Sequence, residues 1–446
     1  MNKSRNRFYV GMVSSLSALA LVACSNDANV AQETTTETAT ATATTTAVAE
    51  GAGEIVESST PRARVALTYD GGVMIMDATS LEVVEKLEKP GFLRLSDAGN
   101  NRHLIVADGS DFSVLDLGAW GQKHGDHSHY YETTPSFADL HFAADETGHA
   151  IAENGRAALY SDGTGSFEIY QIKDLVGEDQ HTADKVTTET IKLPEVHHGL
   201  AVPLEDGNYL VSVGNEEERT GAAVIRPDGS VITESKECKG VHGEAIAADG
   251  AVALGCEDGA LVYRDGKFTK ATNPEDPYSR AGTLVGDPNS AFVMSDYKVD
   301  KDAENEHPEQ FGLIDTKSGT RAKVALPKGV SYTFRSMARG PEGALLLLTT
   351  DGKLRFWTED GQELGSVDVV PAWEEPTEWQ EPRPAIWVDG DLAFVTEPGT
   401  NEIHTIDLSQ ISAGKAEVIK TATLPETPNE IRGIPRKSSL VAAEKS

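Results

Sequence analysis

Three of the chain's twelve histidines are crowded into the stretch GQKHGDHSH, residues 121–129. They are His124, His127 and His129, and Asp126 lies among them. Imidazole nitrogens and carboxylate oxygens are ligands that Zn²⁺ takes in proteins. We expect this polar, glycine-flanked loop to be mobile, so ordering it on binding would lower its affinity. The sequence therefore predicts a weak, rapidly exchanging zinc site, and the alternative is an ordinary solvated loop.

Three further histidines occupy equivalent places in a repeated pattern. Each stands seven or eight residues before a turn glycine or an Asp-Gly step. If the repeats lie side by side, their first strands line one opening, and the three imidazoles converge there in a way that suits tetrahedral zinc. The predicted ligands of this tighter site are His141, His198 and His242. A fourth ligand would come from Glu244, from a residue deeper in the channel that the first strands line, or from another molecule.

His197 is an alternative ligand to its neighbour His198. Successive side chains on a strand point to opposite faces, so only one of the two can face the opening. A lone histidine at the start of a strand is more often a hydrogen-bonded core residue than a ligand. The remaining histidines, which have no partners in the pattern, are expected to be structural: His103, His149, His181, His307 and His404.

The elements that must position these residues are short strands. From residue 62 onward, runs rich in Val, Ile, Leu and aromatic residues are separated by Asp-Gly and Asn-Gly steps, which are strong hairpin signals. No segment in this region has a sustained helical period. Aligning the runs gives a repeat of about 40–60 residues with four strands. This pattern is typical of a blade of a β-propeller, an all-β fold that closes on itself and protects its sheet edges.

The number of blades follows from the repeat count. Seven complete units begin near residues 92, 138, 198, 242, 281, 334 and 383. The segment from residue 62 supplies three strands, and NEIRGIP, residues 429–435, could supply the missing inner one. Both chain ends would then close a ring of eight blades, and seven is the alternative if one unit is miscounted. We predict a propeller over residues 62–436 and a disordered tail over 437–446.

The N-terminus indicates export. A basic stretch with Lys3, Arg5 and Arg7 precedes an apolar run that is too short to span a bilayer, which is typical of a signal peptide. The run ends in Leu-Val-Ala-Cys, which resembles the bacterial lipobox. Residues 1–23 are therefore predicted to be a lipoprotein signal peptide and Cys24 to carry the lipid anchor, and the alternative is an ordinary signal peptide with a chance cysteine. No later run is long enough for a membrane helix.

A Thr-, Ala- and Glu-rich tether follows over residues 24–61. It lacks the apolar residues that could offset its conformational entropy, so we expect it to be disordered and to hold the folded part away from the membrane. The chain carries 71 acidic and 39 basic residues, for a formal net charge of −32. This charge argues against nucleic acid as a partner, because phosphates would be repelled.

Cys238 and Cys256 remain once Cys24 is assigned to the lipid. In an exported protein two such cysteines are expected to form a disulfide. They are eighteen positions apart and flank His242, and a bridge of this span would stabilise the fold by roughly 3 kcal/mol. The alternative is that Cys238 is a thiolate ligand of a metal held with His242.

Five motifs together resemble the AztD-type zinc metallochaperones. They are HGDHSH, LHF, HHGLAVPLEDG, CKGVHGEA and GCEDGALV, in this order over residues 124–262. The resemblance implies an extracytoplasmic β-propeller that hands zinc to the solute-binding protein of an ABC importer. It makes the channel histidines the tight zinc site and the histidine-rich loop a transfer element. The lipobox and the long tether depart from the many members of this family that are free in a periplasm.

The function predicted from these features is zinc binding and delivery by a monomeric, lipid-anchored, extracytoplasmic chaperone that is not an enzyme. Two other classes remain open. A zinc-dependent hydrolase or a lactonase-like propeller enzyme would need a general base beside the metal, for which Glu244 is the one nearby candidate. A surface-anchored propeller that only binds proteins would carry its histidines by chance.

Overall fold

A computed structural model describes residues 53–303 and 306–435 of the 446-residue chain. Four predicted features lie outside these residues: the signal peptide of residues 1–23, the lipid anchor at Cys24, most of the tether and the tail of residues 437–446. Within the compact unit that begins at Glu50, nine β-sheets are described, and eight of them have four antiparallel strands. The all-β fold class is confirmed.

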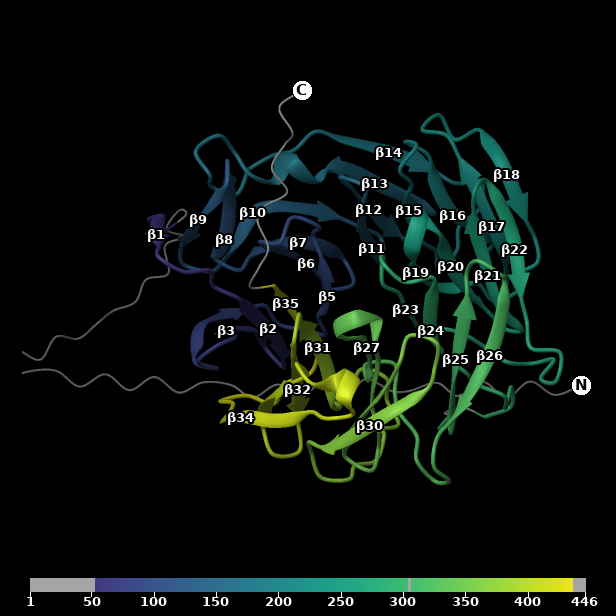
Figure 1. The fold of residues 1–446 in the computed structure, drawn as a ribbon. Helices are drawn as coiled ribbons and strands as arrows, with labels where there is room; N and C mark the ends of the chain where they lie inside the picture. Colours follow the sequence, from purple (N-terminus) through teal and green to yellow (C-terminus); the bar gives the residue numbers. More distant parts are fainter. Residues whose placement is uncertain (1–52, 304–305, 436–446) are drawn as a thin grey trace, which may run out of the picture. The chain divides into compact units, whose positions relative to one another are not determined.

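Six of the four-stranded sheets are built from strands in chain order, with the first strand innermost (Figure 1). The first three contain β11 Thr147–Glu153, β12 Arg156–Ser161, β13 Ser166–Gln171 and β14 Thr188–Lys192; β15 Ala201–Pro203, β16 Tyr209–Gly214, β17 Arg219–Ile225 and β18 Val231–Ser235; and β19 His242–Ile246, β20 Val252–Cys256, β21 Gly259–Arg264 and β22 Lys267–Ala271. The next three contain β23 Leu284–Val285, β24 Phe292–Asp296, β25 Gln310–Asp315 and β26 Thr320–Ala325; β27 Met337–Arg339, β28 Leu345–Leu348, β29 Lys353–Trp357 and β30 Glu363–Asp368; and β31 Ala385–Asp389, β32 Leu392–Glu397, β33 Glu402–Asp407 and β34 Glu417–Thr423.

The other two four-stranded sheets combine strands that are not consecutive. One has the order β35-β2-β3-β4 and the other β10-β7-β6-β5. Their strands are β35 Ile431–Ile434, β2 Arg64–Tyr69, β3 Gly72–Asp77 and β4 Val83–Glu88, and β10 Ser136–Ala143, β7 Asp111–Asp116, β6 His103–Ala107 and β5 Arg94–Asp97. Strand β35 pairs with β2 in antiparallel register, so the segment NEIRGIP completes the N-terminal sheet as predicted.

Apolar side chains on both faces of the inner and middle strands hold successive sheets together. Val73 and Ile75 of β3 pack against Leu104 of β6, which joins the first sheet to the second. Phe394 of β32 packs against Met74 of β3, so the last sheet also packs on the first. The outermost strands, such as β4, alternate between exposed and partly buried residues because only one of their faces is covered. This arrangement of four-stranded sheets is the architecture of a β-propeller.

Short turns and four 3₁₀ helices connect the strands. The helices are η1 Ile172–Leu175, η2 Ala248–Gly250, η3 Pro341–Gly343 and η4 Ile411–Ala413. Asp265 and Gly266 both have positive φ angles and join β21 to β22 in a two-residue hairpin, as the Asp-Gly signal predicts. No helix among the described residues is long and apolar enough to cross a membrane.

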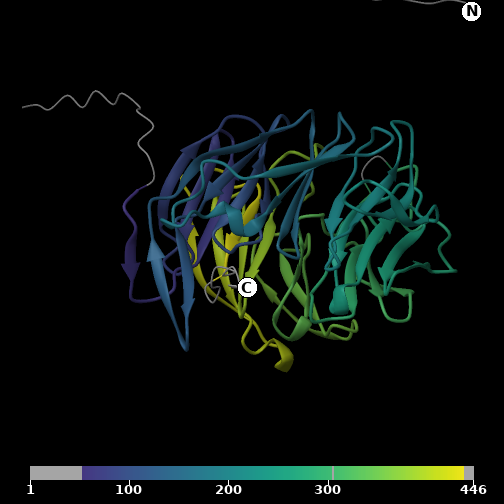
Figure 2. The ribbon, with the colours of Figure 1, turned by 90° about the horizontal axis from the view of Figure 1, so that it is seen from above.

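The ninth sheet has three strands in the order β1-β9-β8. Strands β8 Ala119–His124 and β9 His127–Glu132 form a hairpin, and β1 Val56–Ser58 pairs with β9. Figure 2 shows this hairpin, with β1 beside it, at the edge of the folded unit. The sequence predicts disorder throughout residues 24–61. This is wrong at the C-terminal end of that segment, because residues 56–58 pair with the edge of β9.

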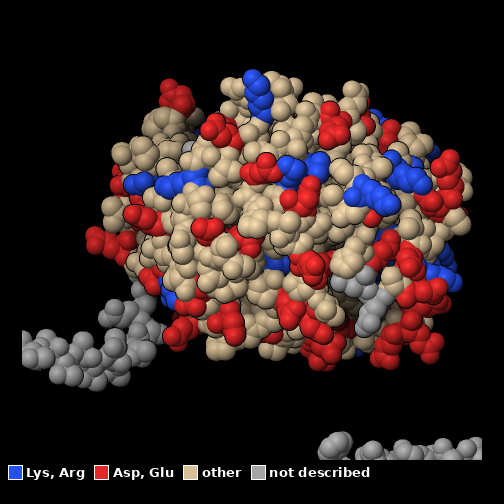
Figure 3. All heavy atoms as spheres, turned by 90° about the horizontal axis from the view of Figure 1, so that it is seen from below, with Lys and Arg blue, Asp and Glu red and all other residues tan. Residues whose placement is uncertain are grey.

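Acidic residues outnumber basic ones by 71 to 39 in the sequence, which gives the net charge of −32. Figure 3 shows Asp and Glu spread over much of one face, with Lys and Arg in smaller groups between them. Such a surface repels polyanions and raises the local concentration of cations.

Candidate metal centre

Three histidines from three successive sheets gather where the inner strands begin. They are His149 on β11, His198 just before β15, and His242, the first residue of β19. Their ligand atoms all lie within 4.8 Å of one another. The ring centroids of His198 and His242 are 5.2 Å apart, and that of His149 is 5.5 Å from His198 and 5.6 Å from His242.

Local backbone irregularities accompany two of these side chains, His149 and His242. The pairing register shifts between Thr147 and Ala150 on β11 and between His242 and Glu244 on β19, so both strands bulge at their histidine. A bulge re-aims a side chain away from the regular alternation of a strand. Gly243 has a φ of +70°, and a Cβ there would lie 2.5 Å from the Gly282 carbonyl oxygen. Glycine at this position therefore permits the close approach that His242 needs.

Each of the three rings has its Nδ1 atom beside a protein acceptor, through hydrogen bonds for His198 and His242 and through an ion-pair contact for His149. His198 Nδ1 lies 2.5 Å from Asp162 Oδ2, and His149 Nδ1 lies 3.1 Å from Glu244 Oε2. His242 Nδ1 lies 2.8 Å from the Gly282 carbonyl oxygen. Metal-ligating histidines characteristically donate their second ring N–H to a carboxylate or a backbone carbonyl, which fixes the tautomer. The Nε2 atoms are thereby left as the nitrogens that can bind a metal.

The electrostatics of the centre differ from ring to ring. Burial and the neighbouring His149 lower the pKa of His242 to about 3, so this imidazole is neutral at physiological pH. Burial also acts to lower the pKa of His149, but the adjacent Glu244 carboxylate outweighs it and raises the pKa. The His242 ring is thus ready to bind a cation, whereas the raised pKa of His149 makes proton competition for this ring stronger as the pH falls.

The dimensions of the centre fit zinc. Tetrahedral ligands at about 2.0–2.1 Å from Zn²⁺ are about 3.3 Å from one another. The candidate ligand atoms already lie within 4.8 Å of one another, so small side-chain rotations would close the site. Three nitrogens leave one coordination position open. Glu244 is not placed to fill it directly, because its carboxylate contacts Nδ1 of His149.

The prediction that His141 belongs to this centre is wrong. His141 lies on β10, the outermost strand of its sheet, where its side chain is 60% exposed and pairs with Asp111 at 3.0 Å. The insertion of the β8–β9 hairpin before β10 made this fourth strand resemble the start of a new repeat. The true first strand is β11, which begins at Thr147 rather than near residue 138.

The histidine that takes this place is His149, which the sequence pattern predicts to be structural. It stands five residues before Asn154-Gly155, both of which have positive φ angles and connect β11 to β12 in a two-residue turn. This Asn-Gly step is the same hairpin signal that marks the other repeats, so it could have identified β11 as an inner strand.

His197 is a buried structural residue and lies outside the centre. Its Nε2 lies 2.9 Å from Ser212 Oγ and its Nδ1 lies 3.1 Å from the Glu195 carbonyl oxygen, so both nitrogens are used by the protein. Burial lowers its pKa. Of the two neighbours, His198 is therefore the one that joins the cluster, as strand alternation allows.

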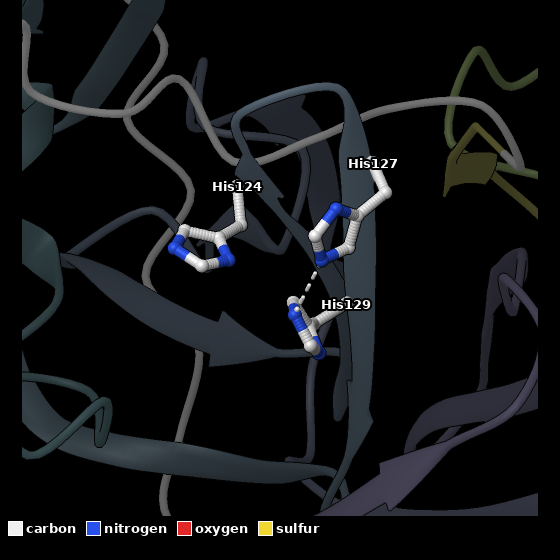
Figure 4. Close-up of side chains that lie close together, drawn as sticks. All are labelled: His124, His127 and His129. Atoms are coloured by element: carbon white, nitrogen blue, oxygen red, sulfur yellow. Dashed lines mark hydrogen bonds between the residues drawn. The ribbon is translucent and has the colours of Figure 1, made fainter.

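A second cluster contains the three histidines of the HGDHSH segment. His124 ends β8, while His127 and His129 lie on β9 with one residue between them, so their rings share one face of the hairpin (Figure 4). The ligand atoms of all three lie within 4.8 Å of one another. His127 Nε2 and His129 Nε2 are 3.1 Å apart, close to the spacing of two ligands on one zinc ion.

The segment is a paired hairpin rather than the mobile loop that its composition predicts. His124 is opposite His127 across a turn at Gly125 and Asp126, and the strands pair down to Ala119 and Glu132. Asp126 is fully exposed, and its carboxylate lies 3.2 Å from Nδ1 of His127. Asp126 therefore orients a candidate ligand and lies outside the cluster itself.

Stacked aromatic groups support the base of this hairpin. The Arg102 guanidinium lies 3.6 Å from the ring centroid of Trp120, which stacks on Tyr131 at 5.6 Å. Arg102 itself is buried and pairs with Asp116 at 2.6 Å. The histidines at the tip are thus exposed on a ribbon whose other end is fixed in the fold.

Cys238 and Cys256 form the predicted disulfide. Cys238 precedes β19 and Cys256 ends β20, and both are fully buried in the apolar cluster that joins the β15–β18 and β19–β22 sheets. The bridge therefore fixes the entrance of the strand that carries His242. Thiolate ligation by Cys238 is not compatible with this bonded state.

Comparison with proteins of curated function finds the zinc chaperone AztD of Citrobacter koseri, which is 27% identical over 331 residues, 71% of this chain and 74% of the relative. The resemblance predicted from the motifs is confirmed. The relative is described as a chaperone and not as an enzyme, in agreement with the prediction for this chain. No family model matches the sequence.

Solved structures show the same fold. The apo form of Citrobacter koseri AztD superimposes with a TM-score of 0.67 over 84% of this chain and 97% of that chain, at 22% identity. A further crystal structure of the same protein gives 0.66 over the same shares. The dihydro-heme d1 dehydrogenase NirN reaches 0.53 at 11% identity, over 85% of this chain and 79% of that one.

Proposed function

We propose that this chain, like the zinc chaperone that it resembles, binds Zn²⁺ and passes it on to another protein. The observation that carries the proposal is the cluster of His149, His198 and His242, each with its Nδ1 atom beside a protein acceptor. Such preset tautomers present three Nε2 lone pairs to one point. Zinc is the cargo of this site, and the open fourth position is where a ligand from a recipient would attach.

An eight-bladed propeller is the scaffold that we propose for the site. Eight four-stranded sheets, with the last packed on the first and β35 paired with β2, support this count. In such a ring the inner strands begin at one opening of the channel, which brings ligands from three sheets together.

The histidine hairpin is proposed to be a second, weaker zinc site that serves exchange. Its candidate ligands are exposed at the tip of a ribbon. Those of the cluster of His149, His198 and His242, which we call the channel centre, are more enclosed. A rigid site releases metal slowly, because several bonds must break without replacement. A second set of imidazoles can supply substitute ligands one at a time, so zinc can move without passing through water.

The proposed recipient is the zinc-binding solute-binding protein of an ABC importer, as the family resemblance implies. The proposed location is outside the cytoplasm, with the chain exported by its signal peptide and held on the membrane through a lipid on Cys24. The disulfide between Cys238 and Cys256 supports export, because such bonds persist in oxidising compartments. We propose that the chaperone acts as a monomer.

Zinc transfer from the purified full-length protein to a zinc-binding acceptor tests this function. The wild type is expected to bind two zinc ions of unequal affinity and to transfer the tighter one faster than it dissociates into a chelator. Changing His124, His127 and His129 to Ala should leave one tight zinc and slow the transfer. Zinc-dependent hydrolysis with no transfer would favour an enzyme, and a protein with no bound metal would favour a scaffold.

A further inference from the structure

Strand β1 brings a carboxylate from the N-terminal segment to the histidine hairpin. Val56, Glu57 and Ser58 pair with Glu132, Tyr131 and Tyr130 of β9. Glu57 Oε1 then lies 2.6 Å from Nδ1 of His129. The hairpin is therefore more than a local motif, because one of its ligands is held by a residue more than seventy positions earlier.

This contact determines which nitrogen of His129 can bind a metal. A carboxylate only accepts hydrogen bonds, so Nδ1 must carry the proton and Nε2 presents its lone pair. In the structure this lone pair accepts the 3.1 Å hydrogen bond from Nε2 of His127, whose proton zinc would displace. His127 is held in the same way by Asp126, whose carboxylate lies 3.2 Å from its Nδ1. Two of the three hairpin histidines, His127 and His129, thus have an acceptor beside Nδ1 and their Nε2 atoms facing each other.

We infer that Glu57 is a positioning residue of the hairpin zinc site, and that docking of β1 and zinc binding at this site strengthen each other. The inference rests on the proposed function of the hairpin and names the residue and segment that set its affinity. Removal of an acceptor that holds a metal-ligating histidine typically lowers the metal affinity by about 10- to 100-fold. By linkage, zinc must favour the docked strand by the same factor.

β1 is short enough to respond to this coupling. It has three residues, and Val56 is 57% exposed, so little apolar surface holds the strand in place. The hydrogen bond from the Thr133 hydroxyl to the Gly53 carbonyl oxygen is one of the few further contacts of this segment. Segments with few buried contacts open at low free energy, and a contact as short as that between Glu57 and His129 then shifts the balance appreciably.

The test compares E57Q with E54Q in the full chain after its channel site has been filled with one equivalent of zinc. Glu54 is exposed in the same segment and makes no contact with the histidines. E54Q therefore removes the same charge as E57Q and leaves the contact with His129 in place. Titration of a second zinc equivalent against a chromophoric chelator should show weaker binding for E57Q, by about tenfold or more, and wild-type binding for E54Q. Equal affinities in all three proteins would overturn the inference.

Two further readouts separate positioning from a general effect on folding. Without zinc, the ¹⁵N shifts of His129 should report an Nδ1–H tautomer in wild type and a mixture of tautomers in E57Q. Amide exchange of residues 54–60 should slow on binding of the second zinc in wild type and in E54Q, but not in E57Q. If wild type binds no second zinc at all, the hairpin role in the proposed function fails. If it does bind, but exchange in β1 is unaffected by zinc, the coupling fails.

Discussion

Replacement of His149 by Ala should weaken the tight zinc site severely, whereas replacement of His141 should leave it unchanged. Sequence alone favours the opposite outcome, so this pair of variants separates the two assignments. His149 lies in the cluster with His198 and His242. His141 is 60% exposed on an outermost strand and contacts Asp111.

The size of the effect follows from the number of ligands. Structural zinc sites bind with roughly 10–16 kcal/mol at neutral pH, so one of four ligands contributes roughly 2.5–4 kcal/mol. The dissociation constant of H149A should therefore rise by about 10²- to 10³-fold. H141A loses a surface ion pair worth less than about 1 kcal/mol in stability and no ligand.

Competition against a chelator of known zinc affinity measures both variants, with circular dichroism and thermal melts as the check on folding. E244Q is a useful companion, because it keeps the His149 ring but removes the charge of the acceptor behind it. H149A that is folded and binds zinc as tightly as wild type would refute the assignment. A loss of zinc affinity of about 10²- to 10³-fold in H141A would also refute it.

Three other predictions follow from the buried groups. The double variant C238S/C256S should lower the free energy of unfolding by roughly 3 kcal/mol in chemical denaturation, and unchanged stability would contradict a structural role for the bridge. Burial lowers the pKa of His103 to about 4 from 6.5, so the unfolded chain binds this proton at higher pH than the folded one. The free energy of unfolding should thus fall by up to about 3 kcal/mol as the pH drops from about 6.5 to 4, and this part of the loss should be absent in H103Q. Glu244 raises the pKa of His149, so the zinc affinity should decline as the pH falls through that raised pKa. In E244Q the decline should occur at lower pH. Zinc affinities of wild type and E244Q that depend on pH in the same way would contradict the contact between Glu244 and His149.

The sequence was sufficient for the fold class and for two of the three histidines of the candidate metal centre. Asp-Gly steps marked the turns that follow the segments of His198 and His242, because such steps favour a tight reversal of the chain. NEIRGIP was matched correctly to the N-terminal strands, although more than 350 residues separate them. The pairing of Cys238 with Cys256 also followed from two cysteines in a chain that is predicted to be exported.

Two features depended on contacts that no local pattern reveals. The β8–β9 hairpin is inserted between the third and fourth strands of its sheet, so the count of strands along the chain slipped by one and His141 was placed on an inner strand. The bulge on β11 that turns His149 inward is a property of its pairing with β12. The strand at Val56–Ser58 exists because β9 offers an edge, and its own residues carry no strong strand signal.

The central claim is that zinc is held by three histidines from successive sheets through their Nε2 atoms. Anomalous diffraction at the zinc edge, from crystals grown with one equivalent of Zn²⁺, tests it directly. The account predicts one strong peak about 2.0–2.1 Å from Nε2 of His149, His198 and His242. A peak at His141, or at the histidine hairpin with the channel centre empty, would contradict it.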